Sequence, residues 1–159
     1  MPQNMINSKR VVVKQPTITL LKSISYSAFW STEQIINESV KALSIVHKIE
    51  QAGTRVNLDI LWTDREGGEQ IIYRLNVKKA SERMNIAKLA FPMVNPSMLR
   101  RICFGALEVE TLDKPRDWRF GYGTPVIDEK EIKKYLANGE HILSHEIKDI
   151  EKEIEKLGL

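Results

Sequence analysis

The chain has almost no cysteine: Cys103 is the only one among 159 residues, so no internal disulfide can form. Disulfide-dependent folds belong mainly to oxidising compartments, and we expect a cytoplasmic protein. Cys103 stands in the apolar run 102–107, and no histidine is close to it in sequence. Because a nucleophilic thiol needs a nearby base, we expect Cys103 to be buried rather than catalytic.

Long apolar runs are also missing. No stretch reaches the roughly 20 apolar residues that a membrane helix needs, and the N-terminus lacks the apolar core of a signal peptide. These features predict a soluble protein that stays inside the cell and has no membrane partner.

Neither sign of charge dominates the chain. It carries 24 basic and 21 acidic residues, a net charge of +3, and the two kinds are interleaved. Nucleic-acid binding usually gives a denser cluster of lysine and arginine, so the charge is weak evidence for such a partner. The length and the 42% apolar fraction predict one domain over residues 1–159, with a flexible N-terminus at 1–9.

Three segments have the patterns of strands. Residues 10–25 are rich in β-branched side chains and predict extended structure interrupted at Pro16. Residues 56–62 and 71–77 alternate apolar and polar side chains, which is typical of strands with one buried face. The charged, glycine-containing turn 64–68 joins them, so the pair predicts a β-hairpin.

Helical signals lie between and after these strands. Ser31 and Gln34 have the spacing of a capping box, and apolar residues then recur at helical intervals until Gly53, a typical helix stop. Residues 85–94 predict a helix, and residues 96–107 predict another, with a proline in its first position.

The last third of the chain predicts three short elements. Residues 128–137 predict a short helix and residues 141–143 a brief extended stretch. From 145 to 159 we expect an amphipathic helix, whose apolar stripe is Ile147, Ile150, Ile154 and Leu157. The stripe resembles a coiled-coil seam, which leaves self-association through this helix open, although packing on its own domain is the more frequent use.

This order of elements predicts a Rossmann-like, three-layer α/β domain. A strand, a crossover helix and a second strand form a βαβ-like start, and the hairpin adds an antiparallel strand at one edge of a mixed sheet. Ligands of such sheets bind at the carboxyl ends of the strands. The first such end, residues 23–27, has neither Gly-x-Gly-x-x-Gly nor Gly-Lys-Ser/Thr, so we expect no dinucleotide or P-loop site there.

The spacing Ser23-x-Ser25-x-Ser27 at this strand end resembles the Asp-x-Ser-x-Ser motif of von Willebrand factor A domains. That family continues with a long amphipathic helix and a strand introduced by Gly-x-Arg-Val, which is similar to residues 53–56. The resemblance covers residues 17–79. It implies a Rossmann-like fold that binds other proteins. The residues 50–56 and 95–101 also resemble uncharacterised proteins of phages and mobile elements.

In the von Willebrand A family the motif binds a divalent cation through its aspartate and hydroxyls. Ser23 stands in the place of that aspartate, so the resemblance implies a degenerate motif at Ser23, Ser25 and Ser27. We expect no metal and no other cofactor, with a divalent cation as the one alternative left open. The other reading is that the hydroxyls satisfy backbone groups of a turn.

A second candidate surface combines arginine with aromatic residues. It comprises Arg116, Trp118, Arg119, Phe120 and Tyr122, and Arg100 and Arg101 could extend it. Such residues anchor protein interfaces, stack bases and pair phosphates, or pin a loop to the domain.

The sequence contains no readable catalytic constellation. We therefore expect a non-catalytic protein-interaction module, which binds another protein through Ser25, Ser27 and the arginine and aromatic residues. The alternative is a nucleic-acid-associated protein that uses Arg100, Arg101, Arg116, Trp118 and Arg119. A third class left open is an enzyme whose site is assembled from residues scattered along the chain.

Overall fold

A mixed four-stranded sheet forms the centre of the computed structural model, which describes residues 14–27, 29–66, 69–109 and 129–158. The strands are β1 (Thr17–Ser23), β2 (Arg55–Glu66), β3 (Glu69–Lys78) and β4 (Glu140–Ile142), in the spatial order β3-β2-β1-β4. β1 pairs in parallel with β2 and with β4, and β3 pairs antiparallel with β2. The expected α/β class, with an antiparallel hairpin at one edge, is confirmed.

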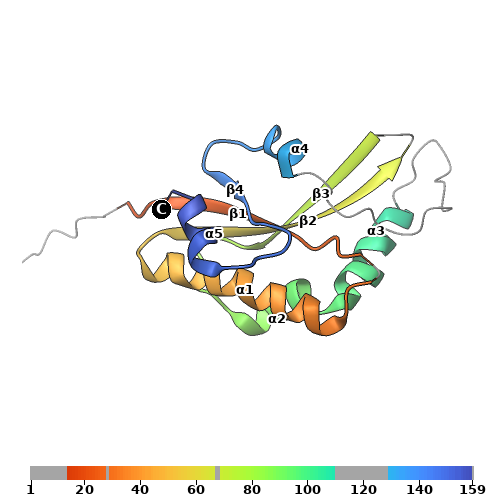
Figure 1. The fold of residues 1–159 in the computed structure, drawn as a ribbon, viewed down its shortest axis with the longest axis horizontal. Helices are drawn as coiled ribbons and strands as arrows, with labels where there is room; N and C mark the ends of the chain where they lie inside the picture. Colours follow the sequence, from red (N-terminus) through yellow and green to blue (C-terminus); the bar gives the residue numbers. More distant parts are fainter. Residues whose placement is uncertain (1–13, 28, 67–68, 110–128, 159) are drawn as a thin grey trace, which may run out of the picture.

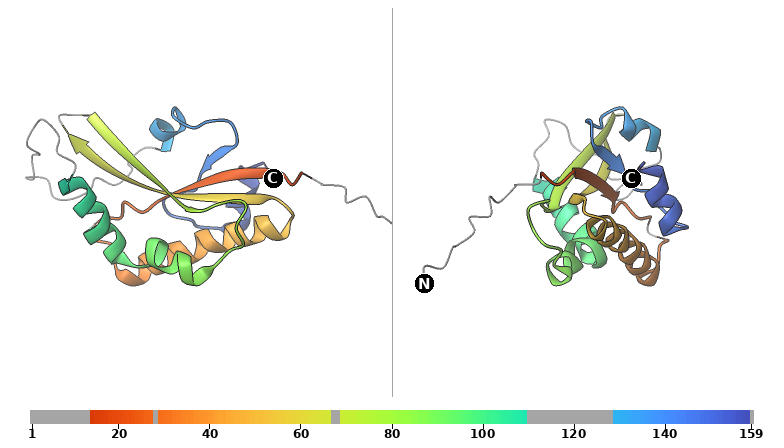
Figure 2. Two further views of the ribbon diagram at one scale, coloured as in Figure 1. Left: turned by 180° about the vertical axis from the view of Figure 1, so that it is seen from behind. Right: turned by 90° about the vertical axis from the view of Figure 1, so that its left-hand side faces the viewer.

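Helices cover the two faces of the sheet unequally. The helices are α1 (Thr32–Gln51), α2 (Ile86–Val94), the π-helix η1 (Met98–Cys103), α3 (Phe104–Val109), α4 (Glu129–Lys133) and α5 (Ile150–Lys156). Figure 1 and the right view of Figure 2 show α1 and α2 on one side of the sheet and α4 on the other. In the part of the chain that the structure describes, the third layer is therefore one short helix.

The main core lies between the sheet and α1. Leu20, Leu58 and Ile60 from the strands, and Ile45 and Val46 from α1, have no exposed surface. The apolar run of β1 is continuous because both of its faces are covered: Leu20 belongs to this core, and Leu21 belongs to a smaller cluster with Leu61 and Ile132 of α4.

The local signals of α1 are confirmed. The Ser31 hydroxyl accepts a hydrogen bond from the Gln34 amide, and the Gln34 side chain accepts one from the Ser31 amide, which completes the capping box. Gly53 follows the helix with φ at +96°, a left-handed conformation that other residues adopt only with strain. Cys103 is buried, as its apolar surroundings predict.

Several elements differ from the sequence prediction. The short helix expected over 128–137 ends at Lys133. The strands of the hairpin run on to Glu66 and from Glu69, so the expected turn at 64–68 is shorter. The helix after Asn95 widens into the π-helix η1, which the apolar pattern did not indicate. The last helix begins at Ile150, capped by Asp149, and not at residue 145.

The apolar stripe of the last segment packs on its own domain. Ile147 is fully buried, Leu157 is 8% exposed, and Ile150 and Ile154 pack against the main core. This intramolecular packing uses the side chains that self-association would need. None of the helices in the described ranges is long and apolar enough to span a membrane.

Candidate functional site

The three serines at the end of β1 bond to backbone amides. The Ser25 hydroxyl accepts a buried hydrogen bond from the Thr63 amide at 2.9 Å, which joins the chain beyond β1 to β2. The Ser23 hydroxyl accepts from the Ser25 amide at 3.3 Å, and the Ser27 hydroxyl from the Phe29 amide at 3.3 Å. These contacts agree with the interpretation that the hydroxyls satisfy turn backbone groups.

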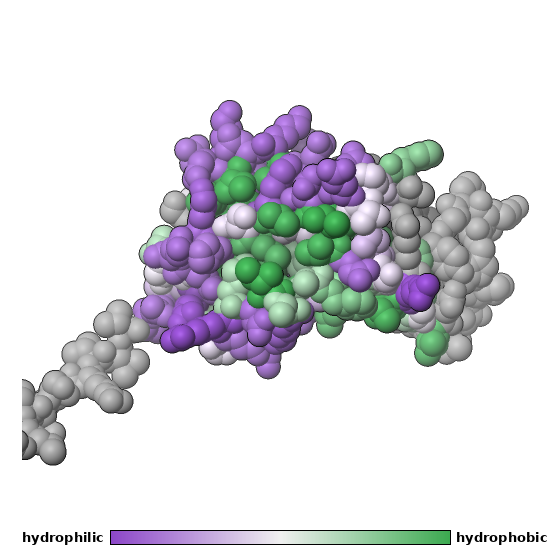
Figure 3. Space-filling view, turned by 90° about the horizontal axis from the view of Figure 1, so that it is seen from below, coloured by the Kyte–Doolittle hydropathy of each residue, from purple (hydrophilic) through white to green (hydrophobic). Residues whose placement is uncertain are grey.

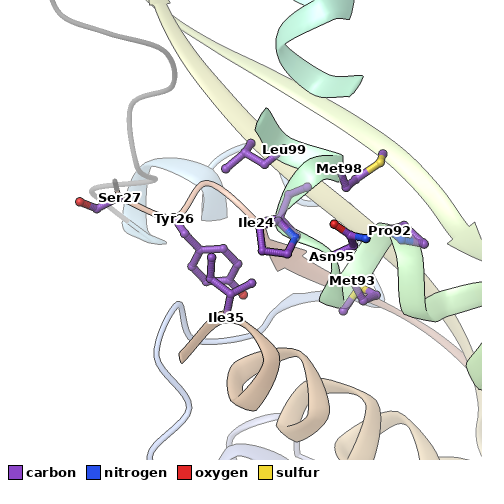
Figure 4. Close-up of a pocket in the computed structure, with 10 residues that line it drawn as sticks. Ile24, Tyr26, Ser27, Ile35, Pro92, Met93, Asn95, Met98 and Leu99 are labelled. Carbon is purple, nitrogen blue, oxygen red and sulfur yellow. The ribbon is translucent and has the colours of Figure 1, made fainter. Parts of the chain in front are cut away.

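A shallow, mainly apolar hollow lies beside this strand end. Its volume is about 20 Å³, and its walls come from the end of β1, from α1 and from the segment that joins α2 to η1. Figure 4 shows Ile24, Tyr26 and Ile35 on one side and Met98 and Leu99 on the other. The lining residues are Ile24, Tyr26, Ser27, Ile35, Pro92, Met93, Asn95, Pro96, Met98 and Leu99.

The lining of the hollow suits binding better than chemistry. Its polar members are a tyrosine, a serine and an asparagine, and none of the lining residues is a carboxylate, histidine, lysine, arginine or cysteine. Within the described ranges, no three or more His, Cys, Asp or Glu side chains are grouped so as to hold a metal ion.

The structure brings only some of the predicted site residues to this place. Ser27 lines the hollow, although Figure 4 shows its side chain pointing away from the other labelled residues. Ser23 and Ser25 are buried. Arg101 is exposed on η1, close in sequence to the lining residue Leu99. The side chain of Arg100 lies outside the described part of the chain, and so do the whole residues Arg116, Trp118, Arg119, Phe120 and Tyr122.

A buried charge cluster, which the sequence analysis missed, holds the C-terminal segment to β1 and α1. The Lys22 ammonium has no exposed surface and donates to the carbonyl oxygens of Ser144 (2.8 Å) and His145 (2.7 Å). The Glu38 carboxylate lies 3.7 Å from it and accepts from the Ile147 amide. The signal was present in the sequence: a lysine inside an apolar strand and a glutamate on the apolar face of α1.

Burial dominates the electrostatics of Lys22. It lowers the pKa of the ammonium to about 8, although the nearby carboxylate of Glu38 favours the charged form. The cluster explains the late start of α5, because backbone groups of residues 144–147 bond to side chains of β1 and α1 instead of to a helix.

Three aromatic rings pack together next to the charge cluster. The ring centroids of Tyr26 and Trp30 are 5.0 Å apart, and those of Tyr26 and His145 are 5.3 Å apart. Burial, followed by the nearby charge of Glu38, raises the pKa of the Tyr26 phenol. The phenol is therefore neutral at physiological pH, and this group fills space between β1, α1 and the C-terminal segment.

The opposite face of the sheet carries a polar network. Arg74 of β3 pairs with Asp59 of β2 and with Glu140 of β4, the latter at 2.7 Å. The side-chain amide of Asn76 donates a hydrogen bond to the Asp59 carboxylate at 2.6 Å. The hydrogen bond from Arg74 holds the pKa of Glu140 below its usual value. Each charged group here has a partner, so the network stabilises the sheet.

An apolar area is exposed on the outer side of α1 and α2. Figure 3 shows it in the middle of that face, bordered by hydrophilic side chains. The exposed apolar residues of the two helices include Ile36, Val40, Ile86 and Phe91. Apolar patches with a polar border are typical of interaction sites.

Comparisons with known proteins identify a family but no activity. Neither the curated proteins nor the solved structures give a match. One family model matches residues 1–159, the whole chain. The chain therefore belongs to the family described as domain of unknown function DUF7192.

Proposed function

We propose that this domain is a non-catalytic protein-interaction module, and that its partner binds at the carboxyl end of β1. The observation that carries the proposal is the apolar hollow at that end, whose lining holds no acid, base or thiol. Ligands of open α/β sheets bind at such strand ends. A site made of apolar walls with a few polar groups supports recognition rather than reaction.

The surroundings of the hollow support the same proposal. Phe29, two residues beyond the lining residue Ser27, is 95% exposed, and large exposed aromatic rings are typical anchors of protein interfaces. An apolar area is also exposed on the outer side of α1 and α2.

The resemblance to von Willebrand A domains belongs to this proposal. The parallel β1 and β2, the long α1 after β1 and the antiparallel edge strand β3 are the arrangement that the resemblance implies. The serine hydroxyls accept from backbone amides, so we propose binding without a metal ion. We place the protein in the cytoplasm, where a lone cysteine remains reduced.

The test is an affinity capture from native extract with matched variants, each run with and without nuclease. Phe29→Ser removes the exposed ring two residues beyond Ser27, and Tyr135→Ser removes another exposed ring, 75% exposed, that follows α4. We expect a stoichiometric protein partner that survives nuclease, is retained by the Tyr135 variant and is lost with the Phe29 variant. Loss of every partner with nuclease would instead favour a nucleic-acid-associated protein.

A further inference from the structure

The outer edge of β3 is open within the described ranges. β2 is the only strand there that pairs with β3, on its inner side. Figure 1 and the left view of Figure 2 show the β2–β3 hairpin extending past the other strands. An edge strand presents unpaired backbone N–H and C=O groups, which can pair with another extended segment.

A groove runs along this edge where β3 approaches α2. Its walls include three consecutive strand residues, Leu75, Asn76 and Val77, together with Phe91 and Met98 from the helices. Successive side chains of a strand point to opposite faces, so a groove that all three residues line follows the edge itself. Its volume is about 520 Å³.

Two large apolar side chains are exposed on the walls of the groove. Leu75 of β3 is 41% exposed and Phe91 of α2 is 46% exposed. They come from different elements and line one groove, so an apolar side chain placed between them would be covered from both sides. Burying it would be favourable at about 25 cal/mol for each Å² removed from water.

Two charged residues of β3, Arg74 and Lys78, are engaged away from its open edge. Arg74 leans over the sheet toward Asp59 and Glu140, and Lys78 is buried against Glu50 of α1. A register shift between Leu58 and Asp59 interrupts the pairing at the end of the strand. Charges that point outward and bulges both protect natural edges, and among the described residues the regular edge from Ile71 to Leu75 has neither protection.

The rim of the groove favours an acidic ligand. Lys88 is paired with Glu82 at 2.8 Å, and Lys79, whose charge also acts on Glu82, lines the same groove. The charged residues that line the groove, Lys79, Lys88 and Glu82, therefore carry one net positive charge beside the apolar walls.

We propose that the edge of β3 binds an extended peptide segment of a partner protein by β-strand addition. The segment pairs with residues 71–75, inserts an apolar side chain between Leu75 and Phe91, and places a carboxylate near Lys79. Backbone hydrogen bonds supply affinity in this mode of recognition, and the side-chain groove supplies specificity. The groove shares Pro92 and Met98 with the hollow at β1, but β3 and Phe91 do not line that hollow, so the two proposals can fail separately.

The experiment titrates the ¹⁵N-labelled full chain with a synthetic peptide of alternating valine and threonine that carries glutamate at both ends. Either strand direction then brings a glutamate to Lys79. We expect amide shift changes confined to residues 71–79 and to the groove walls. A peptide with N-methyl groups on alternate amides should not bind, because it cannot complete the backbone pairing. Equal binding of that peptide, no shift at millimolar peptide, or changes only elsewhere would overturn the proposal.

Two matched variants test the walls and the rim. Phe91→Ser should weaken binding at least tenfold, whereas Ile86→Ser, also exposed on α2 but outside this groove, should not change it. Lys79→Glu should weaken binding, and a peptide with lysine in place of glutamate should restore it. Edge shifts that change on dilution of the protein alone would assign the edge to a second copy of the chain and overturn the peptide proposal.

Discussion

Ser23, Ser25 and Ser27 share a regular spacing but not an environment. Ser25 is buried and bonds to the Thr63 amide of β2, whereas the bond of Ser27 to the Phe29 amide is exposed. The sequence could predict hydroxyls at a strand end, because this preference is local. It could not predict which hydroxyl would join two strands, because that depends on the register of β1 and β2.

The first prediction concerns Ser25. Ser25→Ala removes a buried hydrogen bond and should lower the free energy of unfolding by about 1–3 kcal/mol. Ser27→Ala removes an exposed one and should cost under about 1 kcal/mol. Urea denaturation of both variants measures the difference, and equal effects would contradict the structural role given to Ser25.

The second prediction concerns metal. Millimolar Mg²⁺ or Mn²⁺ should leave the melting temperature unchanged, since the serine hydroxyls already accept from amides and Ser23 brings no charge to the strand end. Thermal denaturation with the metal and with EDTA measures this. A reproducible rise of the melting temperature with metal would contradict this prediction and would favour a divalent-cation site at the three serines.

The third prediction follows from the lowered pKa of Lys22. That pKa is about 8 in the folded chain and 10.5 ordinarily. Between these values the unfolded chain binds a proton that the folded chain has lost, so stability should rise with pH. The free energy of unfolding of the wild type, measured relative to that of Lys22→Met, should therefore increase by on the order of 3 kcal/mol between pH 8 and pH 10.5. If the difference in the free energy of unfolding between the two proteins stayed constant with pH, the lowered pKa of Lys22 would be contradicted.

At the scale of elements, local signals predicted α1 almost completely. Its capping box, its apolar face and its glycine stop all act within a few residues of one another. Removing the cap by Ser31→Ala should cost about 1 kcal/mol, whereas Thr32→Ala, one position later, should change stability little. Thermal denaturation of the two variants tests this, and equal losses would contradict the capping role.

α5 shows where such local reasoning fails. The apolar stripe predicted a helix from residue 145, but Lys22 and Glu38, more than 100 positions away, bond the backbone of residues 144–147. Long-range contacts therefore moved the start of the helix to Ile150. The brief extended stretch before it was predicted, but its parallel pairing with β1 as β4 was not, because pairing is not a local property.

The fifth prediction concerns the attachment of α5. Glu153 accepts from the Ser144 amide at 2.7 Å, and burial opposes its ionisation, but hydrogen bonds from Ser144 and Lys156 outweigh burial and lower its pKa. The ionised Glu153 therefore stabilises the fold at pH values above the pKa that it has in the unfolded chain, and this stabilisation is lost as pH falls through its folded pKa. Glu153→Gln should speed amide exchange in residues 144–158, with little change in β2. Uniform acceleration throughout the chain would contradict a local role.

At the scale of the whole molecule, the sequence predicted the class of fold better than the location of a site. Alternating strands and a capped helix specify an α/β sheet with an edge hairpin. The hollow at β1 instead gathers residues from β1, α1, α2 and η1, which are far apart in sequence. In the sequence, its apolar side chains have the same pattern as core residues, so the sequence could not predict that they line a hollow.

The central claim is that a protein partner binds at the carboxyl end of β1. The most direct measurement replaces Phe29 by a photo-reactive benzoylphenylalanine, irradiates the chain in native extract after nuclease treatment, and identifies the crosslinked products. The same replacement at Tyr135, an exposed ring outside the hollow, is the control. We predict one dominant protein adduct at position 29 and none of the same mass at position 135. The same adducts at both positions, or none at position 29, would contradict the claim.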